Sequence, residues 1–415
     1  MEAKESTRTR IGFSRMEKKY EWKDHVIFMG ILLAMAVWVN RGIEIKGLYM
    51  DDLYFWSCYG EQSFLQYVFP VGSTRFRFLY YLAAWLEMAV VRNHVGWFVP
   101  LNILLNAAVS WSIYFVGRRL SRAKGIGFLC GLMFLISRMA YYQIGQVLGL
   151  METMALWMAV MILWYLFRYL NEKNSQVYFC LSCVLYFGVC FVHERYMALF
   201  PLLLLVLLFK KSRKLLEWGA GLLSFLLVQV IRAFTIGSIL PAGTGGTQVA
   251  DTFSLGDTFW YALSQIAYVF GINAGPEHLN GCPWGQSPLV IKVLVLLADA
   301  AIAVIVLAFV VKMAREKRKD YRIQMLKNST LFILFTGLCI ASSSVTIRVE
   351  MRWVYVSLVS ALLFLAYMYG ELTEGVKPEL YLKRLWPWGA AFACYVVFML
   401  PAELYYRADY PKLYF

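Results

Sequence analysis

The sequence predicts an all-α, polytopic membrane protein without a large soluble domain. Hydrophobic residues fill 60% of its 415 positions and charged residues only 16%, a composition that soluble globular domains do not have. Apolar runs of about 17 to 22 residues recur along the chain, and each is long enough as a helix to cross a hydrocarbon layer of about 30 Å. Short basic connections between these runs carry most of the formal charge of +14. Because those Lys and Arg residues are dispersed, nucleic-acid binding is a poor explanation of the basicity.

We expect about eleven membrane-spanning helices between residues 25 and 403. Residues 1–24 are polar and basic, and the first apolar run lacks a small-residue cleavage site, which predicts a cytoplasmic tail and an uncleaved anchor. In that orientation nearly all Lys- and Arg-rich connections are cytoplasmic, as the positive-inside rule requires, and residues 404–415 form a short outer tail. The expected spans are about residues 25–42, 97–117, 125–141, 153–170, 177–192, 195–210, 215–235, 289–311, 328–345, 353–370 and 387–403.

Two long connections are expected on the outer side, at about residues 43–96 and 236–288. The first contains an apolar segment between Arg77 and Arg92 that would reach only about 22 Å as a helix. Counting it as a span would invert every later loop, so we place it as a helix along the outer membrane interface. The second connection is rich in Gly and Thr at its start, which predicts irregular structure, and in turn residues at its end, which predict an ordered but non-helical cover.

Ionisable residues recur at the outer ends of the expected helices. The pair Asp51 and Asp52, in "GLYMDDLYFW", follows the first span. Charges at a membrane boundary are costly unless they are paired, bind a ligand or take part in a reaction. Acids and arginines that recur at each outer connection therefore favour a buried polar site. The other members of this set are Glu152 before the fourth span, His193, Glu194 and Arg195 in a tight turn, and Arg348, Glu350 and Arg352 in "SSSVTIRVEMRWVY".

These motifs and their order resemble the GT-C superfamily of integral-membrane glycosyltransferases, which includes protein O-mannosyltransferases and lipid A aminoarabinose transferases. The resemblance rests on the acidic pair in the first outer loop, the interfacial helix, and a helix ending in "YFVGRRLSRAKG". It continues in "VCFVHERYMALFPLLLLVLL", at the place of a short turn with a basic residue and a following proline. "RVEMRWVYVSLVSALLFLA" is similar to the late segment in which an Arg precedes an aromatic residue at a helix start.

The resemblance implies an inverting transferase that moves a sugar from a polyprenyl-phosphate donor to a glycan, lipid or protein acceptor of the cell envelope. The enzyme would lie in the plasma (inner) membrane with its active site on the outer face. A general base must take a proton from the acceptor hydroxyl, and Asp51 or Asp52 is the candidate, with Glu152 as a third catalytic acid. Guanidinium groups would stabilise the leaving phosphate. Arg348 and Arg352, four residues apart on one helix face, and Arg195 are the candidates.

Further residues are expected around the substrate. They are His193, Glu194, Glu350, Tyr355 and His278. Asp51, Asp52 and Glu152 could also supply oxygen ligands to a divalent cation, Mg²⁺ or Mn²⁺, although their spacing is not diagnostic of a metal site. Cys58 and Cys282 both fall in outer loops and could pair in an oxidising space.

Each of these residues also has a structural interpretation. Arg352 could anchor a helix end at the interface, and Arg195 could pair with Glu194. His193 could be a turn residue, and Glu152 could cap the fourth span through the helix dipole. Glu87, in the interfacial helix, is expected to face water or to pair with Arg75 or Arg77.

Two other functions remain open at this point. A lipid-linked glycan transporter or flippase would need ionisable groups near the middle of the bilayer, where Arg138, Arg232 and Asp299 are the few candidates. A membrane-embedded polysaccharide polymerase or ligase would be expected to use Arg and His residues of its large outer loop. Neutralising Asp51 and Asp52 would separate these functions from the transferase.

Overall fold

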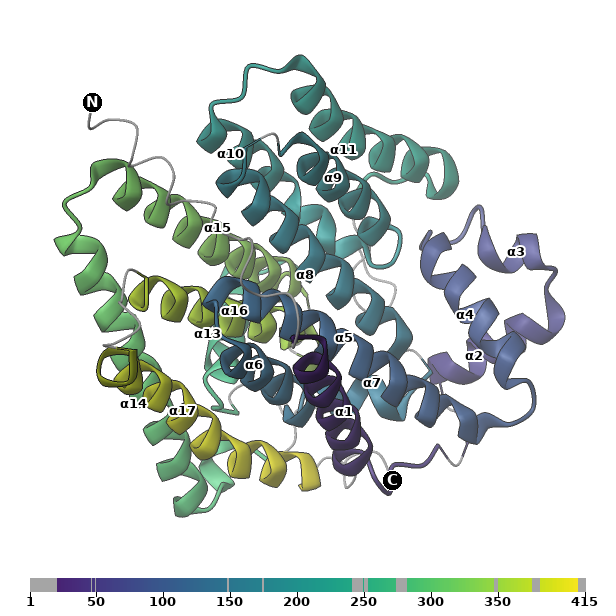
Figure 1. The fold of residues 1–415 in the computed structure, drawn as a ribbon. Coiled ribbons are helices and arrows are strands. Elements are labelled where there is room, and N and C mark those ends of the chain that lie inside the picture. The colour runs from purple at the N-terminus through teal and green to yellow at the C-terminus, as the bar shows by residue number, and fades with distance from the viewer. Residues whose placement is uncertain are drawn as a thin grey trace.

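The structure is a computed structural model, and it describes residues 21–45, 47–48, 50–147, 149–173, 175–240, 249, 253–273, 282–346, 350–374 and 381–409. Helices make up 82% of it, and the described residues contain no strand. The all-α class predicted from the sequence is therefore confirmed. Figure 1 shows long helices packed side by side, with α2, α3 and α4 gathered at one side of the bundle.

The elements follow one another along the chain as helices joined by short connections. In order they are α1 (Glu21–Val39), α2 (Met50–Glu61), α3 (Phe64–Val68), α4 (Phe78–Val91), η2 (Val95–Trp97), α5 (Phe98–Ser121), α6 (Lys124–Ile136), α7 (Ala140–Gly145), α8 (Gly149–Asn171), α9 (Gln176–Cys190), η3 (Glu194–Leu199), α10 (Phe200–Lys210), α11 (Leu215–Ile236), α13 (Leu255–Val269), η5 (Trp284–Gln286), α14 (Leu289–Arg315), α15 (Lys319–Ser344), η6 (Met351–Val354), α16 (Tyr355–Leu372) and α17 (Tyr381–Asp409).

Eight helices among the described residues are long and apolar enough to cross a membrane. Every one of the eleven expected spans coincides with a helix, but α6, α9 and α10 have only 13, 15 and 11 residues. A helix needs about 20 residues to cross the hydrocarbon core alone. The expectation of a multi-pass α-helical membrane protein is thus confirmed, whereas the count of eleven spans is not.

Several boundaries differ from the expected ones for visible reasons. The span expected at 125–141 breaks after Ile136, because Arg138 is fully buried and its backbone N–H and guanidinium both bind Glu403. Residues 404–409, expected in an outer tail, continue helix α17. The helix expected between Arg77 and Arg92 is present as α4.

The second long connection contains a helix, α13, that we did not expect. Ser254 caps its N-terminus by accepting a hydrogen bond from the backbone N–H of Asp257. One face packs on α15, where Gln265 exchanges hydrogen bonds with Ser343 and Ser344. Its other face leaves Phe259 and Trp260 exposed.

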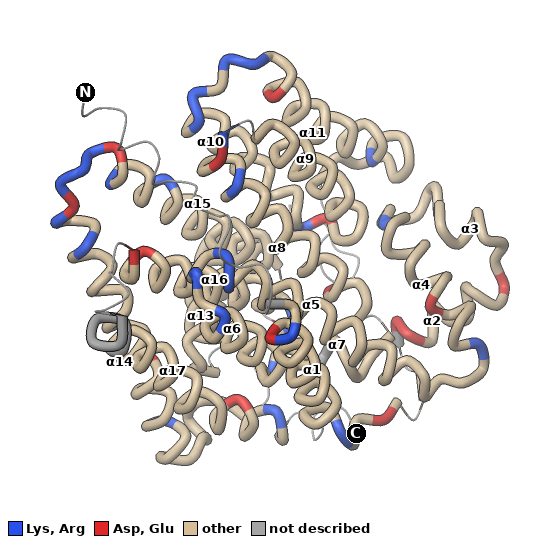
Figure 2. The backbone as a smooth tube through the Cα atoms, viewed as in Figure 1, with Lys and Arg blue, Asp and Glu red and all other residues tan. Residues whose placement is uncertain are grey.

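The helices run between two ends of different chemistry. At one, called here the basic end, Lys124 binds Asp24 at 2.9 Å, Lys210 donates to the backbone carbonyl of Glu172, and Arg122 lies 3.9 Å from Glu374. These contacts collect the α5–α6, α8–α9, α10–α11 and α16–α17 connections at this end. Figure 2 shows the Lys and Arg residues concentrated in the α10–α11 and α14–α15 connections.

Close packing of α5, α6 and α16 forms the centre of the bundle. A Cβ atom on Gly127 of α6 would lie 2.6 Å from the backbone oxygen of Tyr114 in α5, and one on Gly370 of α16 would lie 2.2 Å from that of Leu120. Only glycine permits both approaches. α16 is consequently buried along most of its length. This packing fixes the position of its N-terminus, which lies next to Arg352, relative to the neighbouring helices.

Candidate active site

A cavity of about 960 Å³ lies at the end of the bundle opposite to the basic end. Residues of α2, the 70–77 loop, α4, the α9–η3 turn, α11 and the α15–η6 connection line it. These segments are far apart in the sequence, and they include three of the four outer clusters predicted to meet. Its polar lining includes Asp51, Arg75, Arg77, Tyr81, His193, Glu194, Arg195, Gln229, Ser342, Ser343 and Arg352.

The two adjacent aspartates have different environments. Both lie in the first turn of α2, where the helix dipole favours a carboxylate. Asp51 is exposed and lines the cavity. Asp52 is buried, and its Oδ2 accepts a hydrogen bond of 3.0 Å from the backbone N–H of Val147. Asp51 is therefore the one of the pair that can reach a ligand in the cavity.

Arg77 and Glu194 form a buried, two-pronged ion pair on the cavity wall. Arg77 Nε donates to Glu194 Oε2 at 2.7 Å, and a terminal nitrogen donates to Oε1 at 2.8 Å. Arg75 lies 3.9 Å from the same carboxylate and keeps about a third of its side chain exposed. Burial alone would raise the pKa of Glu194, but the charge of Arg77 outweighs it and holds that pKa well below the usual range. Glu194 is thus a fixed anion that orients two arginines.

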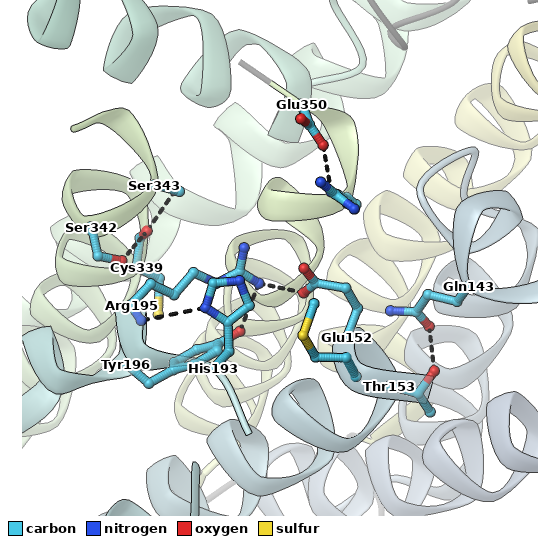
Figure 3. Close-up of polar contacts among 12 residues, drawn as sticks. Gln143, Glu152, Thr153, His193, Arg195, Tyr196, Cys339, Ser342, Ser343 and Glu350 are labelled. Atoms are coloured by element: carbon cyan, nitrogen blue, oxygen red, sulfur yellow. Dashed lines mark hydrogen bonds and ion pairs between the residues drawn. The ribbon is translucent and has the colours of Figure 1, made fainter. Parts of the chain in front are cut away.

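Arg195 pairs with Glu152. The pair with Glu194 that we considered from the sequence is not the one formed. Its guanidinium lies 2.5 Å from Glu152 Oε2 and 3.1 Å from the Tyr196 hydroxyl. Figure 3 shows this guanidinium between Glu152 and Tyr196. Glu152 is 1% exposed and stands behind Arg195, away from the cavity surface. Glu152 therefore holds Arg195 and does not itself line the cavity, where we expected a catalytic acid.

His193 has the turn role that we considered and also lines the cavity. Its Nδ1 accepts a hydrogen bond from the backbone N–H of Arg195 and so caps η3. Burial, together with the charges of Arg77 and Arg195, holds the pKa of His193 well below its ordinary value. It is therefore neutral near pH 7.

Arg352 completes the basic lining. It forms an ion pair with Glu350, which is 1% exposed and precedes η6, and its side chain retains 16% exposure toward the cavity. Its guanidinium also lies 5.8 Å from the centre of the Trp353 ring. Figure 3 shows Glu350 approaching its partner guanidinium. The expected donor-phosphate residue Arg348 and the expected pocket residue His278 lie outside the described residues.

Tyr355 is not at the cavity, contrary to our expectation. It is 1% exposed, its hydroxyl accepts a hydrogen bond of 3.1 Å from Asn106, and its ring stacks on Phe134. It follows Arg352 by three residues, but by then the chain has entered the first turn of α16, which the bundle surrounds. Tyr355 therefore serves the packing of the core.

Guanidinium N–H donors at the cavity surface suit an anionic ligand. Arg75, Arg77, Arg195 and Arg352 line the cavity with Asp51 and Glu194, while Glu152 and Glu350 balance the charges of Arg195 and Arg352 from behind. Arg75 and Arg77 could not have been selected from their sequence context, because "STRFRF" resembles an ordinary loop before a helix. The one available indication was that no acidic residue lies close to them in the sequence, so that any carboxylate partner had to come from a distant segment.

The cavity also has apolar lining residues. Phe55, Met197, Ala198, Ile239 and Leu240 line it next to the polar groups. A ligand that fits both parts has an anionic group and an apolar extension. A cavity of this volume is in the range of small-molecule sites, which span about 300 to 1,000 Å³.

The residues proposed as metal ligands do not come together. No three His, Cys, Asp or Glu side chains within the described ranges lie close enough to hold a metal ion. Glu152 is occupied by Arg195, as described above. Cys58 and Cys282 are free thiols, with Cys58 at the cavity and Cys282 Sγ 3.8 Å from the Tyr405 hydroxyl, so the pairing we considered is not present.

Glu87 contradicts our expectation that it faces water or pairs with an arginine. It is buried in α4, and neither carboxylate oxygen has a hydrogen-bond partner among the described residues. Burial, and to a lesser extent the nearby charge of Asp52, raises the pKa of Glu87 to about 8. The carboxyl is consequently protonated and neutral at pH 7.

This environment predicts that Glu87→Gln stabilises the protein at pH 8.5 and has little effect at pH 5. The folded state retains a proton that the unfolded state loses above its ordinary pKa of about 4.5, so stability falls as the pH rises from about 4.5 to 8. Thermal unfolding in detergent at both pH values measures the difference. Glu61→Gln, at an exposed site of α2, is the control, and equal shifts for both variants would contradict the buried, neutral state of Glu87.

Comparisons with known proteins leave the function to be argued from this geometry. No protein-family model matches the chain, and no curated protein matches it.

Proposed function

We propose that this protein is a membrane glycosyltransferase of the GT-C type, which transfers a sugar from a polyprenyl-phosphate donor to an acceptor of the cell envelope. The observation that carries the proposal is the cavity in which the exposed carboxylate of Asp51 shares the lining with four guanidinium groups. A carboxylate suits the acceptor, which must lose a proton. The guanidinium groups suit the donor, whose phosphate gains charge as it leaves.

In the proposed reaction the acceptor oxygen attacks the anomeric carbon of the sugar. The bond between that carbon and the phosphate oxygen breaks, and its electron pair leaves with the polyprenyl phosphate. Asp51 takes the proton of the acceptor hydroxyl. Asp51 is in the first turn of α2, and its exposure at the cavity leaves its oxygens accessible to an incoming hydroxyl.

Arg75, Arg195 and Arg352 are proposed as the donor-phosphate ligands. Arg195 and Arg352 each have a buried carboxylate behind them, Glu152 and Glu350, which fixes the guanidinium in place before a ligand arrives. Preorganised charges of this kind stabilise developing charge without reorganising during the reaction. The apolar lining residues Ile239 and Leu240 suit the first isoprene units.

The proposed location is the plasma (inner) membrane, with the cavity on its outer face. The cavity and the basic end lie at opposite ends of α15, whose 26 residues extend about 39 Å. The positive-inside rule favours a cytoplasmic position for the basic end. The cavity is then accessible to a donor in the outer leaflet, and envelope glycans, lipids and proteins are the acceptor classes within reach.

The test is a transfer assay with the purified chain in liposomes. A radiolabelled sugar on a polyprenyl phosphate is offered with an envelope extract as acceptor, and a nucleotide sugar is offered in parallel. We expect label in the acceptor and free polyprenyl phosphate from the lipid donor only. Intact donor that merely changes leaflet would favour a flippase, and chain growth without a separate acceptor would favour a polymerase.

A further prediction concerns Arg352. Arg352→Ala is expected to lower transfer about 10- to 100-fold, because a charge-assisted contact to phosphate contributes about 1.5 to 3 kcal/mol. Arg352→Lys should restore only part of the rate, since a point charge replaces a planar fork. Initial rates across a range of donor concentrations measure both variants.

Arg318→Ala is the matched control for this measurement. Arg318 also pairs with a glutamate two residues earlier, Glu316, but it lies at the basic end and is exposed. The Arg318→Ala substitution should leave the transfer rate unchanged. An unchanged rate and donor saturation in Arg352→Ala would assign Arg352 to the helix-end anchor role and shift the phosphate site toward Arg195.

A further inference from the structure

A second hollow, of about 660 Å³, lies at the basic end of the bundle. It is formed where α14 ends, where the connection to α15 begins, where α16 ends and where α17 begins. Nothing in the proposed transfer reaction uses it, because the two hollows are at opposite ends of α15. The lining residues used below are Ala308, Val311, Arg315, Lys317 and Trp388.

The lining changes from apolar to cationic along α14. Ala308 and Val311 come first, and Arg315 follows seven residues after Ala308, about 10 Å along the helix axis. Val311 is 45% exposed and belongs to a helix of the length and composition of a membrane span. This is the order of groups that a phospholipid presents when it is read from its acyl chain to its phosphate.

The charges at this hollow are available to an outside anion. Arg315 and Lys317 are exposed, and neither makes an ion pair with a described residue. Glu316, the acid between them, is held by Arg318 through contacts of 2.9 Å from two guanidinium nitrogens. Lys312 donates to the backbone carbonyl of Glu371 and so ties α14 to the end of α16.

We propose that this hollow binds one anionic phospholipid of the adjacent leaflet. Its phosphate would lie against Arg315 and Lys317, its glycerol near Trp388, and one acyl chain along Ala308 and Val311. Tryptophan is suited to the level of the glycerol because its ring is amphipathic. Basic pockets between membrane helices are sites where lipid headgroups bind. The bound lipid would join α14 and α17.

Lipid binding by the full-length protein tests this proposal. Native mass spectrometry is performed with phosphatidylglycerol and with phosphatidylcholine of the same acyl chains. We expect at least one phosphatidylglycerol to remain bound under conditions that remove phosphatidylcholine. The double variant Arg315→Gln, Lys317→Gln should weaken that retention about tenfold, since each basic residue near an anionic surface contributes a several-fold preference.

The matched control is Lys211→Gln with Arg213→Gln. These two residues are also exposed, two positions apart and at the basic end, but they lie in the α10–α11 connection outside the hollow. The Lys211→Gln, Arg213→Gln variant should retain phosphatidylglycerol as the wild type does. Equal losses in both double variants would overturn the proposal in favour of diffuse charge attraction, and equal retention of the two lipids would overturn it as well.

Two further measurements locate the ligand. Glycerol 3-phosphate should not compete for the site at concentrations far above that of the lipid, whereas full competition would show a site for soluble phosphate and overturn the lipid assignment. Phosphatidylglycerol with brominated acyl chains should quench part of the tryptophan fluorescence, and Trp388→Phe should remove that part while the lipid still binds. Unchanged quenching in Trp388→Phe would show that the chain lies elsewhere.

Discussion

Asp51→Asn is expected to abolish measurable sugar transfer, with a loss of about 10²- to 10⁴-fold, and to leave folding intact. A positioned general base contributes a factor of this size, and the amide of asparagine cannot take up the acceptor's proton. Asp51 is exposed at the cavity, so its replacement removes no buried contact. Initial transfer rates with the lipid-linked donor, alongside the thermal unfolding temperature in detergent, measure the two effects separately.

Asp52→Asn makes the same chemical change one residue away and is the control. Its side-chain oxygen can still accept the hydrogen bond from the backbone N–H of Val147, so transfer should remain within about threefold of the wild-type rate, well below the loss expected on removing a base. If Asp52→Asn lost activity and Asp51→Asn kept it, the base would have been assigned to the wrong aspartate. Near-normal transfer in both variants would remove the catalytic assignment altogether.

Glu194→Gln is expected to lower the free energy of unfolding by about 3 to 5 kcal/mol. Removing one partner of a buried ion pair leaves the other charge uncompensated, and here Arg77 would lose a carboxylate that accepts two of its hydrogen bonds. The pair joins the loop before α4 to the α9–η3 turn, so the loss should also loosen the α2–α4 side of the cavity. Thermal unfolding in detergent and protease sensitivity of the 70–77 loop measure the two consequences.

Glu172→Gln is the control for this effect. Glu172 also binds an arginine, Arg168, through two hydrogen bonds, but both side chains are about a third exposed at the basic end. Exposed pairs typically contribute about 0 to 1 kcal/mol, so this variant should unfold close to the wild-type temperature. A Glu194→Gln protein as stable as Glu172→Gln would mean that the Arg77 pair does not hold the cavity wall.

Hydrophobic segments could be located from the sequence because their signal is local. Each expected span coincides with a helix, and α4 was recognised from its length and its flanking arginines. Local signals do not fix where a helix is interrupted by a distant partner. The break after Ile136 depends on Glu403, which lies 265 residues from Arg138. α13 was missed because its amphipathic pattern lies between two glycine-rich stretches that indicate irregular structure.

The candidate site was predictable in its composition but not in its pairing. Of the acids and arginines expected at the outer helix ends, Asp51, Glu194, Arg195 and Arg352 line one cavity, whereas Glu152 and Glu350 lie behind the arginines that they bind. Which acid holds which arginine depends on the folded arrangement, so Glu152 and Glu194 changed partners relative to the simplest local assignment. The different environments of Asp51 and Asp52 likewise depend on the folded chain, because Asp52 binds the backbone N–H of Val147, which lies 95 residues away in the sequence.

The ion pairs behind the cavity have a consequence for how such a chain can change over generations. Arg77 with Glu194, Arg195 with Glu152 and Arg352 with Glu350 each set a buried carboxylate against an arginine. A single substitution that removes the charge at any of these six positions leaves its partner largely buried and without a counter-charge. Descendant sequences would therefore tend to keep or exchange the two members of a pair together. Asp51 is exposed at the cavity and is not part of these pairs. Under the proposed function, selection on the reaction alone would keep it, so a descendant that loses it could keep the fold and give up transfer.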